Sequence, residues 1–169
     1  MLDPGPNLIS IPCLPEDNSI DNMLSSLENL LTGVIAGGAA AQYIEGIGFI
    51  GALMELDHHS GYWFLIDPEI DGPIPYTLTG QPAEDIHYAF NSAGINLISY
   101  QGEDNTLLSN ALPDDIEPYI PNIIGQGNAA TQISGNWYGS LNEIAPESGY
   151  WVIMNNEATL SISEAIPSS

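Results

Sequence analysis

The sequence predicts a β-rich α+β protein of two tandem, similar modules, each a small twisted sheet or half-barrel with one helix. Three repeated stretches lead to this fold class. Ser-Gly-Tyr-Trp at residues 60–63 precedes an apolar run and recurs, with a second such run, at 148–151. Asn-Leu-Ile-Ser occurs at 7–10 and 96–99, and Glu-Asp-Asn followed by Ser or Thr occurs at 16–19 and 103–106. Because the copies lie 87 to 89 residues apart, the chain is interpreted as one unit written twice.

The repeat divides the 169 residues into a first module, 1–80, and a second module, 81–169. The polar, turn-rich stretch 80–85 is the predicted boundary. Modules of roughly eighty residues are near the lower size at which a core is self-sufficient. We therefore expect the two modules to share an interface. The signature residues of the repeat are Gly61, Tyr62, Trp63, Gly149, Tyr150 and Trp151.

The elements of the first module follow from apolar periodicity and from turn residues. Residues 7–12 predict a short strand that Pro12 ends. Ser19 is placed as the N-cap of an amphipathic helix of about three turns, since apolar residues follow at helical spacing. The remaining predicted strands are 32–35, a hairpin of 41–44 and 49–53 across a Gly-containing turn, the buried strand 62–66, and a closing strand 76–79.

The second module is predicted to follow the same plan with a weaker helix. Residues 86–90 predict an extra leading strand before the second Asn-Leu-Ile-Ser. Thr106 is placed as a helix cap, but prolines at 113, 118 and 121 divide the following segment into short turns. The strands predicted to correspond to those of the first module are 123–124, 129–133, 137–141, 150–154 and 159–162.

The charge is unusual, because the chain has 22 acidic residues and neither lysine nor arginine. Stability must therefore come from burial and hydrogen bonding, while the carboxylates repel one another. Nucleic acid and anionic membranes are disfavoured as partners, since phosphate binding needs basic side chains. No apolar run predicts membrane insertion. Either the chain is adapted to a cation-rich or protease-rich exterior, or the sequence is an imperfect read in which residues such as those of the Ala-rich stretch 36–41 replace longer side chains.

No combination of residues predicts catalysis, so the chain is expected not to be an enzyme. The sequence Asp57-His58-His59 has metal-binding residue types, but neighbouring residues of a strand face opposite sides, and the second copy reads Ala-Pro-Glu. Asp17 and Asp104 are weak calcium candidates, because oxygen ligands cluster in both acidic turns. The favoured interpretation of these turns is helix capping. The expected cofactor is therefore none, with calcium as the alternative, and Cys13 is expected to be a small buried hydrophobe.

As a set, these motifs resemble a GYW-type repeat module of large secreted and surface proteins of marine bacteria and of virion proteins of their phages. The resemblance rests on Asn-Leu-Ile-Ser, Glu-Asp-Asn-Ser, Gly-x-Leu and Gly-Tyr-Trp, and covers nearly the whole chain. The family commonly has Lys before Gly-Tyr-Trp and Glu in the Gly-rich turn, where this chain has Ser60, Ser148 and residues 36–38. The resemblance implies an extracellular, cell-surface or virion location and no catalytic residues.

The expected function is that of a non-catalytic structural or adhesive module, self-associating or appended to a larger protein. The predicted partner is protein, most simply further copies of the chain, through the uncharged closing strands 76–79 and 159–162. The alternative is a carbohydrate-binding module in which exposed Trp137, Tyr138 or Tyr43 stacks on a glycan. In that case the partner would be a glycan instead.

Overall fold

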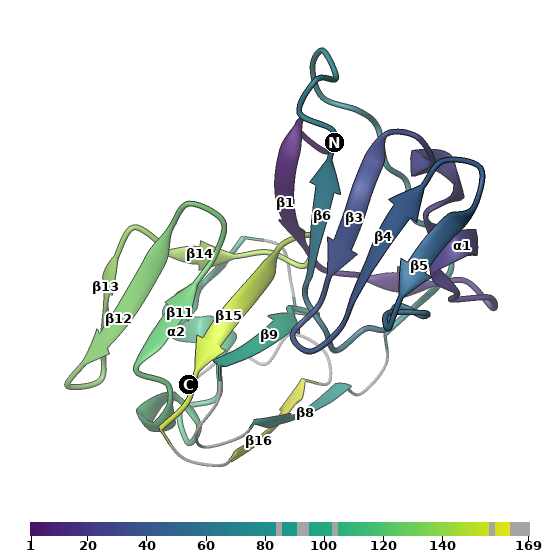
Figure 1. The fold of residues 1–169 in the computed structure, drawn as a ribbon. Helices are drawn as coiled ribbons and strands as arrows, with labels where there is room; N and C mark the ends of the chain where they lie inside the picture. Colours follow the sequence, from purple (N-terminus) through teal and green to yellow (C-terminus); the bar gives the residue numbers. More distant parts are fainter. Residues whose placement is uncertain (84–85, 91–94, 103–104, 156–157, 163–169) are drawn as a thin grey trace.

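The computed structural model describes residues 1–83, 86–90, 95–102, 105–155 and 158–162, and shows a β-rich α+β fold with open sheets. Ten strands form two five-stranded antiparallel sheets. The first sheet has the order β1-β6-β3-β4-β5 (Figure 1). Its strands are β1 (Gly5–Ile9), β6 (Tyr62–Ile66), β3 (Leu31–Ile35), β4 (Ala40–Ile44) and β5 (Gly48–Gly51).

The second sheet has the order β9-β15-β11-β12-β13, which is the order of the first sheet with each strand replaced by its counterpart in the sequence repeat. The Tyr-Trp pair of the signature lies in the second strand of both sheets, between the Asn-Leu-Ile-Ser strand and the next strand. The members of the second sheet are β9 (Ile95–Ser99), β15 (Gly149–Ile153), β11 (Asn122–Ile124), β12 (Ala129–Ile133) and β13 (Asn136–Gly139).

The pairing registers of the two sheets also correspond. Trp63 pairs with Leu8 and Ile35 in the first sheet, and Trp151 pairs with Leu97 and Ile124 in the second. Both hairpins end at a glycine with positive φ, Gly51 (φ 157) and Gly139 (φ 145). A Cβ at either glycine would lie 2.1 or 2.2 Å from a backbone oxygen of the neighbouring strand, so only glycine fits.

The first predicted helix is shorter than expected. The first consists of α1 (Ile20–Met23) and a 3-10 turn, η1 (Ser25–Leu27), instead of three continuous turns. The Ser25 hydroxyl donates to the Asn22 carbonyl, which satisfies the backbone locally, and Asn29 takes a left-handed φ of 64 that turns the chain back. In the second half, α2 (Leu108–Ala111) has Leu107 as its N-cap and no side-chain cap, so the prediction of Thr106 as cap is wrong. A further 3-10 turn is η2 (Glu117–Tyr119).

The described structure also contains three two-stranded ribbons. The predictions of 76–79 and 159–162 as closing strands are wrong. Residues 76–79 form no strand: they cross the first core, where the Tyr76 hydroxyl donates to the Met23 carbonyl at 3.1 Å. Residues 159–162 belong to a ribbon that pairs with the predicted leading strand, not to the sheet of the second half. The ribbons pair β8 (Ile86–Phe90) with β16 (Ala158–Ile162), β2 (Cys13–Leu14) with β7 (Gln81–Pro82), and β10 (Thr106–Leu107) with β14 (Glu143–Ile144).

Buried side chains form two separate clusters, one on the inner face of each sheet. The first draws its buried members from residues 2–66 and the second from residues 88–154. The sheets approach each other where β1 contacts β15 and β6 contacts β9 (Figure 1). Each half therefore buries a core of its own, and the halves meet through strands rather than through a common core.

Candidate functional site

The aromatic residues predicted as a glycan platform do not lie together. Tyr43 is in the first sheet, where its ring packs edge-on against Phe49 with centroids 5.2 Å apart. Trp137 packs against the second core, and its indole N–H donates to Glu117 Oε1 at 3.0 Å. Burial raises the pKa of this carboxyl group, against the opposing effect of the Trp137 hydrogen bond. Tyr138 is 57% exposed and faces the opposite side of β13 from Trp137.

The tyrosines of the signature are structural in both halves. The Tyr62 hydroxyl accepts a hydrogen bond from the backbone N–H of Asp57 at 2.8 Å. The Tyr150 hydroxyl accepts one from the N–H of Ala145 at 2.9 Å, five residues upstream in each case. Burial, together with the Asp57 charge, raises the pKa of Tyr62 to about 12. Each tyrosine is therefore buried and holds the loop that precedes its own strand.

The weak calcium candidates cannot be compared as a pair, because Asp104 lies outside the described residues. The carboxylate of Asp17 accepts the backbone N–H of Ser19 at 3.1 Å, and the Ser19 side chain in turn accepts the N–H of Asn22. Hydrogen bonds from Ser19 lower the pKa of Asp17. The observed contacts of Asp17 are those of a helix entry.

The Asp57-His58-His59 stretch forms a turn and not a metal cluster. One Asp57 oxygen accepts the backbone N–H groups of His59 and Ser60 at 2.8 and 2.7 Å. His58 Nδ1 lies 2.9 Å from the Ile11 carbonyl oxygen, whereas His59 Nδ1 lies 3.9 Å from Asp57 Oδ1. Within the described part of the chain, no three His, Cys, Asp or Glu side chains are grouped so that they could hold a metal ion.

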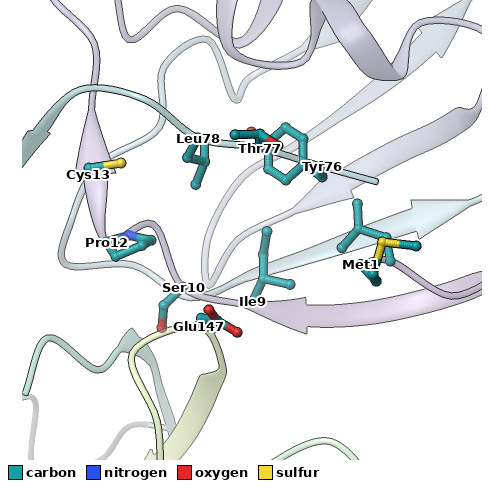
Figure 2. Close-up of a pocket in the computed structure, with 10 residues that line it drawn as sticks. Met1, Ile9, Ser10, Pro12, Cys13, Tyr76, Thr77, Leu78 and Glu147 are labelled. Atoms are coloured by element: carbon teal, nitrogen blue, oxygen red, sulfur yellow. The ribbon is translucent and has the colours of Figure 1, made fainter. Parts of the chain in front are cut away.

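A cavity of about 320 Å³ opens beside the junction of the halves. Figure 2 shows Cys13 and Leu78 at one end, Met1 and Tyr76 at the other, and Glu147 of the second half beside Ser10. The lining is mainly apolar, and burial raises the pKa of the Tyr76 hydroxyl, so this group stays neutral. Cys13 is half-buried instead of fully buried. The cavity offers apolar contacts and one carboxylate, and no lysine, arginine or histidine side chain lines it.

The outer, solvent-facing sides of the sheets are the surfaces that sequence reasoning missed. None of the ten strands of the two sheets contains Asp or Glu. Exposed apolar side chains gather on the outer faces in equivalent positions. On the first sheet they are Ile35, Ile44 and Ile50, and on the second Ile124, Ile133 and Tyr138. Two features of the sequence could have indicated these surfaces. The ten strands contain no acidic residue, and apolar residues occupy alternate positions that face solvent.

The first outer face also has a shallow groove. Gly33 lies between Leu65 on β6 and Gln42 on β4, and its missing side chain leaves the depression that Ile35 and Ile50 border. Asn122 occupies the matching position of the second sheet, between Ile153 and Thr131. The first sheet therefore presents a grooved apolar surface, and the second a fuller surface of the same kind.

These features support binding chemistry. The described residues hold a mainly apolar cavity and two outer sheet faces that carry no acidic residue. No helix in the described ranges is long and apolar enough to cross a membrane. Comparison of the chain with protein-family models, with curated proteins and with solved structures gives no significant match.

Proposed function

We propose that the chain is a pair of tandem modules, 1–80 and 81–169, that serves as a non-catalytic structural or adhesive component of an extracellular, cell-surface or virion assembly. The observation that carries this proposal is the separation of charge from the sheets. All of the acidic residues lie outside the ten sheet strands, while those strands present isoleucine and tyrosine to solvent. The resemblance to GYW-type surface and virion repeats agrees with this role.

The distribution of charge also favours further copies of the chain as partners. With a formal charge of −22, two copies repel each other strongly at most orientations. The sheet faces are where two copies can approach with the fewest carboxylates between them and the most apolar area to bury. Association through these faces is expected to strengthen with salt, because salt screens the repulsion that remains.

The test is light scattering at increasing NaCl and protein concentration on the chain and on Ile50→Glu. Ile50 lies on the first outer face and is 51% exposed. Ile47→Glu is the matched control, since Ile47 is 71% exposed but stands in the turn between β4 and β5. We expect the parent and the control to increase in mass with salt while Ile50→Glu stays monomeric. A strictly monomeric parent at every condition would contradict self-association and leave the role of an appendage to a larger protein.

Of the three aromatic residues that the carbohydrate-binding alternative uses, Tyr138 is the one with an exposed side chain. Glycan-array binding that disappeared in Tyr138→Ala but persisted in Tyr43→Ala would favour it.

A further inference from the structure

The two repeated motifs meet each other across the junction of the halves. The end of the first Asn-Leu-Ile-Ser strand lies against the start of the second Gly-Tyr-Trp strand, and the reverse pairing also occurs. Ile9 forms an antiparallel bridge with Ser148, and Ile98 forms one with Ser60. Each member of the first pair is the sequence counterpart of a member of the second.

The backbone hydrogen bonds of this junction show the same reciprocity. The N–H of Ser10 donates to the Glu147 carbonyl at 3.1 Å, and the N–H of Ser99 donates to the His59 carbonyl at 2.9 Å. Ser10 and Ser99 each end a copy of Asn-Leu-Ile-Ser, while Glu147 and His59 each stand two residues before the glycine of Gly-Tyr-Trp. These two backbone hydrogen bonds, like the two bridges, therefore join equivalent atoms of the halves in both directions.

The glycine of Gly-Tyr-Trp and the serine of Asn-Leu-Ile-Ser both lie at this junction, where there is little space for a larger side chain. A Cβ on Gly61 would lie 2.7 Å from the Ile98 carbonyl oxygen, and one on Gly149 would lie 2.8 Å from the Ile9 carbonyl oxygen. The Ser10 and Ser99 side chains are 2% and 0% exposed. Their hydroxyls donate across the junction to the carbonyls of Ser148 and His58, respectively. A bulkier residue at the glycine, or an apolar one at the serine, would not preserve these backbone contacts.

We propose that this junction is a self-complementary docking surface whose second occupant is another copy of this chain, so that two chains can exchange halves and form a dimer. A contact in which equivalent residues meet in both directions is isologous, the kind that closes a two-fold dimer. The contacts are made mainly to the backbone, so their geometry is the same whichever chain supplies the opposite half. Each half buries its own core cluster, so exchange opens neither core.

Concentration decides between the closed monomer and the exchanged dimer. Within one chain the opposite half is present at an effective concentration that is on the order of mM for short connections. The closed monomer is therefore favoured in dilute protein. Refolding at protein concentrations that approach this value gives the exchanged dimer. This inference concerns the junction and is independent of the outer sheet faces.

The experiment places a disulfide across the junction in the full chain with Cys13→Ser. Ile9→Cys with Ser148→Cys is suitable, because an antiparallel pair flanked by the Ser10–Glu147 bond has its Cα atoms close enough for a disulfide. The protein is unfolded in denaturant, refolded from low to high concentration, oxidised and run on a non-reducing gel. The control pair, Tyr43→Cys with Phe49→Cys, joins neighbouring strands of one half on the side of the sheet opposite to Ile50, so it links within a chain.

Exchange predicts that a disulfide-linked dimer increases with refolding concentration for the junction pair, while the control pair gives linked monomer throughout. Linked monomer alone at every concentration would overturn the proposal. Ser60→Cys with Ile98→Cys provides the equivalent test from the other side if the first pair fails to fold. Adding Gly149→Val to this second pair should abolish its linked dimer, and a dimer that persists would mean that chains associate elsewhere.

Discussion

The two halves of the molecule share strand order and pairing register but differ in what covers the inner face of the sheet. In the first half, α1 and the segment 70–78 pack on the core. In the second half, α2, residues 112–120 and Tyr88 of the β8–β16 ribbon occupy that place. The junction residues, which are held by backbone contacts, are alike in both halves. Elements that only cover apolar surface have diverged, because many shapes can exclude water equally well.

The largest difference between the halves is expected from truncating equivalent core residues. Phe64 and Val152 occupy matching strand positions and are 0% and 1% exposed. Phe64→Ala should destabilise by about 3–5 kcal/mol, and Val152→Ala by less, because a smaller side chain leaves a smaller cavity. Urea unfolding, followed by fluorescence of Trp63 in the first half and of Trp137 and Trp151 in the second, measures both. If the halves unfold as separate modules, each variant shifts one transition, whereas a single shared shift would argue for one cooperative unit.

The junction glycines should respond equally, since their surroundings are equivalent. Gly61→Ala and Gly149→Ala each place a methyl group against a backbone carbonyl of the other half, so we expect losses of about 1–3 kcal/mol in both. Gly38→Ala is the control, because its Cβ would have no neighbour within 4 Å. Thermal or urea unfolding of the three variants is the measurement. A loss confined to one junction glycine would show that the junction is not reciprocal in energy.

Removing the hydroxyl of either signature tyrosine should lower the free energy of unfolding by a similar amount. Tyr62→Phe and Tyr150→Phe each leave a loop N–H without its acceptor, with an expected loss of about 1–2 kcal/mol. Tyr62 adds a dependence on pH, because burial raises its folded pKa to about 12 while an unfolded tyrosine titrates near 10. Its contribution is full below pH of about 10 and is lost as pH rises through about 12.

Unfolding free energies measured between pH 8 and 12 separate the two effects of Tyr62. As pH rises, the free energy of unfolding should fall less in Tyr62→Phe than in the parent protein. An unchanged alkaline slope would mean that other groups account for it.

A smaller effect is expected where the halves differ in helix capping. Ser19 caps α1 by accepting the N–H of Asn22, whereas α2 has no side-chain cap. Ser19→Ala should lower stability by about 1 kcal/mol or less, given a 3.4 Å bond. Ser26→Ala, on the same segment, is the control and should have almost no effect. Equal losses in both variants would contradict the capping role of Ser19.

The smallest expected effect is a specific response to calcium. Because Asp17 is engaged by Ser19, Ca²⁺ and Na⁺ at matched ionic strength should raise the melting temperature equally, through screening of the −22 charge. Asp17→Asn should respond to both salts as the parent does. A larger rise with Ca²⁺ that disappears in this variant would establish a calcium site at the first acidic turn.

Much of the strand arrangement followed from the sequence, because β-pairing depends on local apolar runs and on turn glycines. The strand 62–66, the hairpin across 45–48 and the presence of two equivalent Gly-Tyr-Trp strands were predicted from such patterns. The α1 region was predicted as a longer helix, since its apolar spacing suits a helix. Local hydrogen bonds of Ser25 and the left-handed turn at Asn29 end it early.

Tertiary structure alone decided what the repeated residues contact. Spacing identified Gly61 and Gly149 as equivalent, but only the packed halves show that each lies against a carbonyl of the other, because contacts 37 and 140 residues apart in sequence leave no local pattern. The same holds for the aromatic residues of β13. Trp137 and Tyr138 are equally aromatic in sequence, and the pleat of a strand that covers a core sends one inward to Glu117 and the other to solvent.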